Sequence, residues 1–291
     1  MLQQTTVATV RPRFERFLAR WPTLEALAAA QDEEILQEWA GLGYYARARN
    51  LIACAREVAK RGGFPRTAAG LRQLPGIGAY TSAAIAAIAF GECAPAVDTN
   101  VERVVARLHG LKESPRKEVE GLMGEMLPTD RPGDFVQAMM DLGATICRPR
   151  KPRCDQCPLT PHCVAFASNS PESFPERRKS AARPHRHGIA FWIERDQHVW
   201  LVRRPATGLL GGMPALPGTE WTGSEPPSSQ VIGKVRHVFS HFSLDLHLVP
   251  SSAPEGEGWW QPLDQVDQAG LPALYRKAVR HALSSNDQRA T

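Results

Sequence analysis

The spacing of apolar residues changes once along this 291-residue chain, and that change limits the folds open to it. Up to about residue 165, apolar residues recur at helical spacing, and no stretch alternates as a strand would. After about residue 185, short stretches alternate with a period of two. The polar, proline-bearing segment 168–184 between them is typical of a linker. We therefore predict an α+β chain of two domains: an all-α domain over residues 1–167 and a smaller α+β domain over residues 185–291.

Several stretches of the first domain carry the helix pattern. Asp32 is placed to cap a helix that runs to Trp39 and ends at the glycine turn 41–43. The other helices are expected over residues 46–61, 79–90, 100–108 and 134–146. The second of these is so rich in alanine that we expect it to be buried. In the second domain the pattern predicts strands over residues 188–193, 199–202 and 244–249 and a terminal helix over residues 272–284.

Composition sets broad limits on function. A content of 43% hydrophobic and 22% charged residues is typical of a globular protein and excludes a disordered or fibrous one. The longest apolar stretch, residues 83–90, is too short to span a bilayer, and the segment 1–6 lacks the features of a signal peptide. We therefore expect a cytoplasmic protein with no membrane partner. The net charge of +5 favours polyanions only slightly, and the basic clusters at 148–153 and 177–186 can equally be solvated surface.

Most of the cysteines lie close together in the chain. They are Cys147, Cys154, Cys157 and Cys163. In a reducing cytoplasm, such clustered thiols indicate a metal centre rather than disulfides. Zinc and a [4Fe-4S] cluster both accept four thiolates, and although zinc is the commoner occupant of such loops, the spacing by itself favours neither strongly.

The segment Leu74-Pro-Gly-Ile-Gly-Ala-Tyr80 lies between two helical stretches. Gly76 and Gly78 would let the backbone approach a ligand closely, and the N–H groups at the start of the next helix can hold a phosphate. A helix-hairpin-helix grips a DNA backbone in this way without reading bases. An ordinary turn between two helices explains the same pattern, so both interpretations stay open.

Asp98 stands directly before the expected helix 100–108. The simplest interpretation is an N-cap, because aspartate is a preferred residue there. The alternative is a carboxylate that faces a groove beside the hairpin. In that position it could stabilise positive charge that develops on a deoxyribose.

Taken together and in this order, these motifs resemble the helix-hairpin-helix DNA glycosylase superfamily with its C-terminal iron–sulfur loop. The more specific resemblance is to the adenine DNA glycosylase (MutY) family, and it covers nearly the whole chain. Its markers are residues 1–5, 41–47, 74–81, 97–100, 141–147, 208–213 and 237–241. The resemblance implies a [4Fe-4S] cluster, rather than zinc, on the four clustered cysteines, within the loop 147–163.

The resemblance also implies an activity. The family removes adenine mispaired with 8-oxoguanine or guanine by hydrolysing the N-glycosidic bond of a flipped-out nucleotide. Asp98 would be the catalytic carboxylate, and Tyr80 and Asn100 would organise it and the reacting water. Tyr80 stands where lyase-competent relatives of the endonuclease III type carry a lysine nucleophile, so the strand should stay intact or be nicked only weakly.

Further residues acquire binding roles from the same resemblance. Gln3, Gln4 and Tyr44 would wedge into the base stack, with Leu42 nearby. Gln137 would meet the edge of the adenine. Gly76 and Gly78 would contact the DNA backbone. The expected partner is double-stranded DNA that contains 8-oxoguanine:adenine or guanine:adenine mispairs, bound by a monomer in the bacterial cytoplasm, near the nucleoid.

The second domain resembles a Nudix fold. Residues 211–231 carry no Glu-rich Nudix helix, so we do not expect pyrophosphate hydrolysis. The resemblance makes this domain the module that recognises 8-oxoguanine: Ser240 would hydrogen-bond the lesion, and Phe239 and His241 would fix its loop. Without the resemblance, Phe239 reads equally well as a core aromatic and His241 as a polar residue at a strand end.

One expected residue lies outside the sequence. In the resembled family the general acid is a glutamate two residues before the methionine that here is Met1. Residues 1–291 alone are therefore expected to bind the lesion but to cleave it poorly, and a start assigned too far downstream is favoured over a truncated paralogue. Two alternative functions remain: a lesion-binding protein without catalysis, and a glycosylase acting on thymine opposite guanine.

Overall fold

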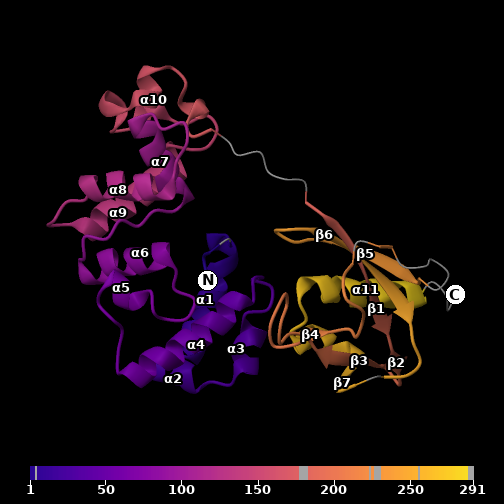
Figure 1. Cartoon of the computed structure of the whole chain (residues 1–291). Helices are drawn as coiled ribbons and strands as arrows, with labels where there is room; N and C mark the ends of the chain where they lie inside the picture. The colour runs from indigo at the N-terminus through magenta and orange to yellow at the C-terminus, as the bar shows by residue number, and fades with distance from the viewer. Residues whose placement is uncertain (4, 177–182, 223, 226–230, 255, 288–291) are drawn as a thin grey trace. The chain divides into compact units, whose positions relative to one another are not determined.

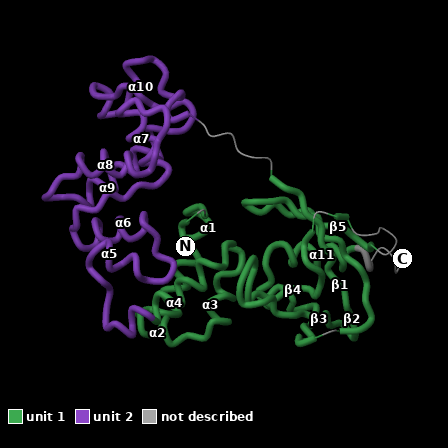
Figure 2. The backbone as a smooth tube through the Cα atoms, in the orientation of Figure 1, with its two compact units in different colours: residues 1–56, 181–291 green, residues 57–180 purple. Residues whose placement is uncertain are grey.

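The computed structural model describes residues 1–3, 5–176, 183–222, 224–225, 231–254 and 256–287. They form two compact units, drawn in different colours in Figure 2. The first unit combines residues 1–56 with residues from 181 onward, and the second comprises residues 57–180. This division differs from the predicted domain limits because the first 56 residues group with the C-terminal strands. Part of the predicted linker 168–184, residues 177–182, lies outside the described residues.

The N-terminal part of the first unit is helical (Figure 1). Its helices are α1 (Val7–Arg20), α2 (Leu24–Ala29), α3 (Asp32–Glu38) and the first part of α4 (Ala46–Arg61). Thr6 and Thr23 cap the first two helices, each accepting a backbone N–H through its hydroxyl oxygen. Phe17, Trp21 and Trp39 pack in the core beneath them. The predicted limits of α4 are confirmed.

The prediction for the start of α3 is wrong by one residue. Gln31 is the N-cap, without a side-chain hydrogen bond, and Asp32 is the first helical residue. The Asp32 carboxylate instead accepts a hydrogen bond from Arg56 at 2.6 Å. With Glu33 and Glu34 it places negative charge in the first turn, where the helix dipole is favourable.

The C-terminal part of the first unit contains two small sheets and a helix. The strands are β1 (His185–Trp192), β2 (Glu194–Arg195), β3 (His198–Arg203), β4 (Pro214–Ala215), β5 (Gly233–Val238), β6 (Ser243–Pro250) and β7 (Trp259–Pro262). In the first sheet β6 is central, parallel to β1 and antiparallel to β5; in the second, β3 pairs with β2, β4 and β7. Helix α11 (Ala273–Asp287) lies along the first sheet (Figure 1).

The three predicted strands and the terminal helix are confirmed to within a few residues. Strand β5 was not predicted, because Val235 is its only buried residue and cationic side chains surround it. Its apolar signal is therefore too short to reveal the strand. Between Gly211 and Val231, the described residues contain no helix, and residues 223 and 226–230 lie outside the described part of the chain.

The second unit is helical and ends in short turns. Its elements are α5 (Ala68–Leu71), α6 (Ala79–Phe90), α7 (Thr99–His109), α8 (Arg116–Met126), α9 (Pro132–Asp141), the π-helical turn η1 (Leu142–Ile146), the 3₁₀ turns η2 (Cys154–Gln156), η3 (Thr160–His162) and η4 (Pro171–Ser173), and α10 (Val164–Ala167). The helix predicted over 134–146 begins earlier, because Pro132 suits the first helical turn, and it widens into η1.

Helix α6 is buried on one side, as its alanine content predicted. Ala83, Ala86 and Ala87 are almost fully buried. Small side chains there let α9 approach closely: a Cβ on Gly133 would lie 2.7 Å from the carbonyl oxygen of Ala87. Neither α6 nor any other helix among the described residues is long and apolar enough to cross a membrane.

Candidate functional site

The turn between α5 and α6 presents open backbone. Gly76 has a φ of +74°, which favours glycine. Gly78 is the N-cap of α6 and offers no side-chain cap, so the first-turn N–H groups of α6 have no side-chain acceptor from it. A Cβ on Gly78 would meet nothing within 4 Å. The turn therefore has the backbone donors and the space to bind an anion.

Asp98 is the N-cap of α7, and its carboxylate is fixed by neighbouring donors. Its Oδ1 accepts the backbone N–H groups of Asn100 and Val101, at 2.9 and 2.8 Å. Its Oδ2 accepts the side-chain amide of Asn100 at 3.1 Å. Because a carboxylate has about four acceptor positions, these bonds orient it without using it up. Capping the helix and serving a reaction are thus compatible roles for Asp98.

Tyr80 lies in the first turn of α6, and the negative charge of Asp98 acts on its hydroxyl group. Its hydroxyl donates to the sulfur of Met140 at 3.5 Å. Burial, and then the negative charge of Asp98, raise the pKa of Tyr80 above its ordinary value. The side chain is therefore a neutral phenol at neutral pH. Gln137 lies exposed on α9, and its amide donates to the carbonyl of Gly133 at 3.2 Å.

Arg103, which belongs to none of the sequence motifs described above, connects Asn100 to the π-helical turn. Its guanidinium donates to Asn100 Oδ1 at 3.0 Å, and to the carbonyls of Gly143 and Cys147, both at 2.8 Å. Burial lowers the pKa of Arg103, with the cation still paired to these acceptors. The sequence does offer one indication of this role: Arg103 follows Asn100 by three residues on the same helix, so the two side chains are neighbours.

The four clustered cysteines lie half-buried along the loop that follows η1. Arg107 of α7, only 3% exposed, anchors the start of this loop. It donates to Cys147 Sγ at 3.3 Å and to the carbonyl of Arg148 at 2.7 Å. The Cys163 thiol in turn donates to the carbonyl of Arg107 at 3.4 Å. One arginine thus holds both ends of the cysteine segment.

The spacing of the thiols tests which metal centre they fit. One zinc ion with Zn–S bonds of about 2.3 Å would draw four sulfurs to about 3.8 Å from one another. Among the described residues, no three of these sulfur atoms all lie within 4.8 Å of one another. They are nevertheless close enough that burial and the other three cysteines raise the pKa of Cys154. Four half-buried thiols on one loop are a donor set that both zinc and an iron–sulfur cluster accept.

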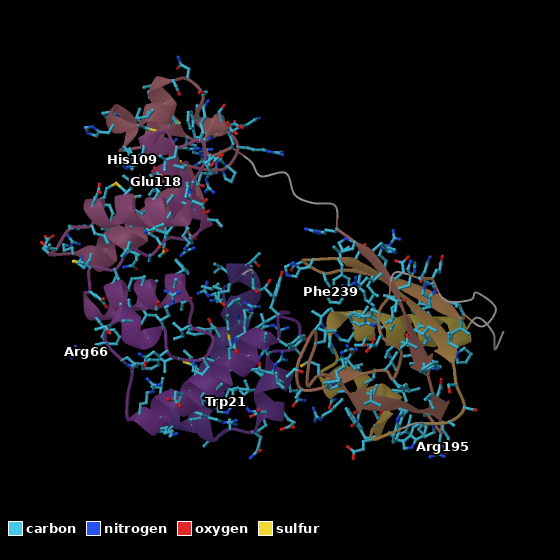
Figure 3. All side chains as sticks on the ribbon, viewed as in Figure 1. Trp21, Arg66, His109, Glu118, Arg195 and Phe239 are labelled. Carbon is cyan, nitrogen blue, oxygen red and sulfur yellow. The ribbon has the colours of Figure 1, made fainter. Side chains whose placement is uncertain are left out.

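A second candidate site lies in the first unit. A cavity of about 450 Å³ is lined by residues 41–49, which include the start of α4, and by residues 237–242, where the chain leaves β5 and turns toward β6. The hydroxyls of Tyr44 and Ser240 are hydrogen-bonded to each other there. Phe239, labelled in Figure 3, stacks on Trp221 with ring centres 5.5 Å apart. His241 lines the cavity, and its side chain is exposed.

The predicted wedge residues differ in their exposure. Leu42 is 5% exposed and belongs to the core, whereas Tyr44 is 46% exposed with a φ of +48°. The guanidinium of Arg47 lies over the Tyr44 ring at 5.5 Å. Gln3 is exposed, and its carbonyl accepts a hydrogen bond from Arg47. Gln4 lies outside the described residues.

Two family models match the chain: HhH-GPD superfamily base excision DNA repair protein over residues 1–129, and NUDIX domain over residues 189–281. The adenine DNA glycosylase of Homo sapiens is 35% identical over 96% of this chain and 66% of its own length. That of Buchnera aphidicola subsp. Acyrthosiphon pisum is 33% identical over 97% of this chain and 87% of its own length. The chain belongs to the adenine DNA glycosylase family.

Membership of this family confirms the predicted fold class, a helix-hairpin-helix domain followed by a Nudix-like one. The chain spans about two thirds of the length of the human adenine DNA glycosylase. A solved structure of a trapped endonuclease III–DNA covalent intermediate matches it with a TM-score of 0.51 and 30% identity, over 58% of this chain and 81% of that one. The turn 74–78, Tyr80 and Asp98 fall within the first matched model, and the turn 239–241 falls within the second.

Proposed function

We propose that this chain removes adenine from duplex DNA by hydrolysing the bond between the base and its deoxyribose. The observation that carries the proposal is the Asp98 carboxylate, held by three hydrogen bonds in the same compact unit as the turn 74–78. The match to base excision DNA repair proteins supports it, as do relatives named adenine DNA glycosylase.

The reaction begins with access to the base. An adenine stacked in a duplex cannot be reached, so its nucleotide has to leave the stack and enter a pocket. The turn 74–78 suits the task of holding the strand, because backbone N–H groups bind phosphates without reading sequence. We therefore assign the DNA backbone to Gly76, Gly78 and the first turn of α6.

Cleavage requires a carboxylate beside the sugar. As adenine leaves, the deoxyribose acquires oxocarbenium character, which a nearby carboxylate stabilises in sugar hydrolysis generally. Asp98 fills this role, and Asn100 fixes its Oδ2. Asn100 is itself fixed by Arg103. Tyr80, a neutral phenol, has no amine with which to form a Schiff base, so we propose that the strand stays intact.

The departing purine also needs a proton. The family resemblance assigns it to a glutamate that precedes the segment Met1-Leu-Gln-Gln. General acid catalysis contributes about 10²–10⁴-fold in typical enzymes. The assay below is for that reason run on residues 1–291 and on an extended chain, in which a segment with the family's glutamate is fused before Met1.

We assign the base opposite the adenine, 8-oxoguanine or guanine, to the turn 239–241 and Tyr44. 8-Oxoguanine differs from guanine in presenting an N–H donor at N7 and a carbonyl acceptor at C8. Hydroxyls both donate and accept, so Tyr44 and Ser240 can exchange their mutual hydrogen bond for bonds to this altered edge. Phe239 would keep the turn in place through its stacking on Trp221.

We propose further that Cys147, Cys154, Cys157 and Cys163 hold a [4Fe-4S] cluster. Four thiolates are its usual donor set, and all four cysteines lie half-buried on one loop. Bound there, the cluster would supply cross-links within the loop and no chemistry of the hydrolysis. The ordered loop would present cations to DNA phosphates. These cations are Arg148, Arg150, Lys151 and Arg153.

The test is single-turnover release of adenine from a duplex with one 8-oxoguanine:adenine pair. In the extended chain, Asp98→Asn should lower the rate at least about a hundredfold, the usual cost of removing one electrostatic stabiliser. Asparagine is also a good N-cap, so α7 and DNA binding should persist. Asp134→Asn, an exposed carboxylate paired with Arg131, is the matched control and should leave the rate unchanged.

Each other outcome has a defined meaning. An unchanged rate in Asp98→Asn removes Asp98 from the mechanism. Tight mispair binding without release by both polypeptides would replace the enzyme with a lesion-binding protein. Release of thymine from a guanine:thymine duplex at a comparable rate would place the chain in a different substrate class. We expect a single copy of the chain per mispair, which the stoichiometry of the binding titration checks.

A further inference from the structure

The outer face of the sheet β1-β6-β5 carries buried polar side chains. On β6, Leu244, Leu246 and Leu248 point into the core, so the period of two places Asp245 and His247 on the opposite face. Both are nevertheless buried, with 2% and 4% exposure. Buried polar groups of this kind require partners.

The neighbouring strands supply those partners on the same face. His187 of β1 and Arg236 of β5 are both in register with Asp245. The Asp245 carboxylate accepts two hydrogen bonds from Arg236, at 2.8 and 3.1 Å, and lies 3.6 Å from the ammonium of Lys234. Its charge is therefore matched by cations, and Asp245 is committed to a structural ion pair.

His247 has a different environment. Its Nε2 lies 3.3 Å from Nδ1 of His187 and 4.0 Å from a carboxylate oxygen of Glu225. The three ligand atoms all lie within 4.8 Å of one another. A tetrahedral zinc ion with Zn–N bonds of about 2.0–2.1 Å places two nitrogens about 3.3–3.4 Å apart. The imidazole pair already has this separation.

We propose that His187, Glu225 and His247 form a binding site for a divalent first-row transition metal ion of the zinc class. Two imidazoles and one carboxylate are the ligands such ions prefer, and the three leave a position for water. Calcium and magnesium prefer oxygen ligands throughout, so they suit this set poorly. Without a metal, the contacts of the site would be a hydrogen bond between the two imidazoles and a 4.0 Å ion pair between Glu225 and a protonated His247, and the test below separates that arrangement from a metal site.

The charges around the site allow a cation to enter. Each neutral imidazole would carry its proton on the other ring nitrogen, so ligation changes no imidazole charge. Glu225 offsets part of the metal charge, and Asp245 continues to neutralise Arg236 and Lys234. The side chain of Glu225 is 62% exposed, which gives the ion a path from solvent.

The site would fasten one chain segment to the sheet. Thr222 and His187 already exchange two backbone hydrogen bonds, at 2.7 and 2.8 Å, so the chain is held to β1 three residues before Glu225. Ligation by Glu225 would fix the far end of that segment against β6. The role is structural, and it is independent of adenine removal because none of the three ligands belongs to the sites proposed above.

The test is zinc binding to the full-length protein with its cysteine loop loaded with iron. Equilibrium dialysis with metal analysis should find one more zinc per chain in the wild type than in Glu225→Gln or His187→Asn. Loss of one ligand should weaken zinc binding by at least about tenfold, because even the loss of a residue that only hydrogen-bonds to a ligand typically weakens metal binding by about 10–100-fold. Zinc should also raise the Tm of the wild type in a concentration-dependent way, and raise that of both variants much less at the same zinc concentration.

Two matched variants control for charge and for surface binding. Glu220→Gln removes an exposed carboxylate from the same segment, and His198→Asn removes a histidine from β3; both should bind zinc as the wild type does. Glu225→Gln also guards against misfolding, because its side chain is exposed. Zinc uptake that survives both Glu225→Gln and His187→Asn would overturn the site. An equal Tm response to magnesium would overturn the assigned class of metal.

Discussion

At the scale of single residues, two arginines of α7 join the carboxylate site to the cysteine loop. Arg103 and Arg107 are one helical turn apart and so share a face of the helix. Both reach Cys147: Arg103 contacts its carbonyl oxygen at 2.8 Å and Arg107 its sulfur at 3.3 Å. A disturbance in the cysteine loop therefore has a direct route to Asn100, which Arg103 also holds.

Replacing Arg107 by methionine should detach this loop. The guanidinium donates to the carbonyls of Arg148, Pro149 and Phe174, and each would lose a charged donor. Hydrogen bonds to charged groups contribute about 1.5–3 kcal/mol, so the free energy of unfolding should fall by at least that amount. Iron content, measured by metal analysis, should fall with it. Arg72→Met, at an exposed position, is the control; equal iron content in both variants would contradict the anchoring role.

The ion pair of Asp245 predicts a dependence of stability on pH. Hydrogen bonding to Arg236 lowers the pKa of Asp245 to about 2, below the value of about 3.9 in an unfolded chain. The folded state therefore gains stability above about pH 4, and loses it as the pH falls toward 2. Asp245→Asn should cost about 1.5–3 kcal/mol at pH 7, roughly half of that at pH 3, where the folded-state carboxylate is still mostly charged, and little at pH 2.

Urea unfolding of the wild type and this variant at pH 7, 4 and 3 measures the difference. Asp264→Asn, an exposed carboxylate, should lose almost nothing at any of these pH values. A loss in Asp245→Asn that is the same at pH 3 as at pH 7 would show that the charge of Asp245 is not the cause.

Local sequence rules anticipated the cap role of Asp98 and the need for glycine at Gly76, because both follow from a few neighbouring residues. They could not identify Arg103 and Arg107 as anchors. Those side chains meet carbonyls some forty positions further on, at Gly143 and Arg148. No local pattern marks an arginine that will be buried by such a distant loop.

At the scale of elements, the π-helical turn η1 decides how closely the cysteine loop approaches α7. Gly143 lies in this turn and is buried. A Cβ there would lie 2.8 Å from the Cβ of Asn100 and 2.9 Å from its carbonyl oxygen. The carbonyl belongs to α7, so it can move only with the helix. Helix α7 and η1 thus touch at the residue that orients Asp98.

Gly143→Ala should accordingly impair both stability and adenine release. Forcing extra volume into a packed contact costs about 1–3 kcal/mol. Displacement of Asn100 should slow single-turnover release while the affinity for the mispair changes little. Gly121→Ala on α8 is the control: its Cβ would meet nothing within 4 Å, and alanine should stabilise that helix by up to about 1 kcal/mol. A Gly143→Ala variant as stable and active as the wild type would show that α7 and η1 can separate freely.

Helices with a long, regular pattern were predictable, and short strands with few buried residues were not. The alanine-rich stretch gave α6 its correct limits, because small side chains and burial both favour helix packing there. The pattern over 134–146 gave one helix, since a widened turn keeps the same apolar face as an α-helix. Strand β5 is recognisable only through its pairing with β6, which is a tertiary property.

At the scale of the whole molecule, the compact units do not follow the order of the chain, because one unit combines residues from both of its ends. The first 56 residues belong to the same unit as the C-terminal sheets. Arg49 donates to the carbonyl of Gly211 at 2.5 Å, and Gln37 to that of Gln268 at 2.9 Å. The first contact joins α4 to the turn before β4, and the second joins α3 to the 3₁₀ helix Leu263–Ala269; neither the turn nor the 3₁₀ helix was predicted from hydrophobic periodicity. The sequence therefore predicted the two structural classes but not this association.

The contact between Tyr44 and Ser240 offers a test of that association, and the test rests on the proposed function. Each hydroxyl is the partner of the other in the free protein, so removing either one should also release its partner. Tyr44→Phe and Ser240→Ala should each lower the binding preference for 8-oxoguanine over guanine by about 5–10-fold, the equivalent of one hydrogen bond. The double variant should lose less than the product of the two, because the hydroxyls act as a pair. Ser284→Ala, on α11, should change nothing. Fully multiplicative effects would mean that Tyr44 and Ser240 meet the DNA separately, and unchanged preferences would move recognition of the opposite base away from this cavity.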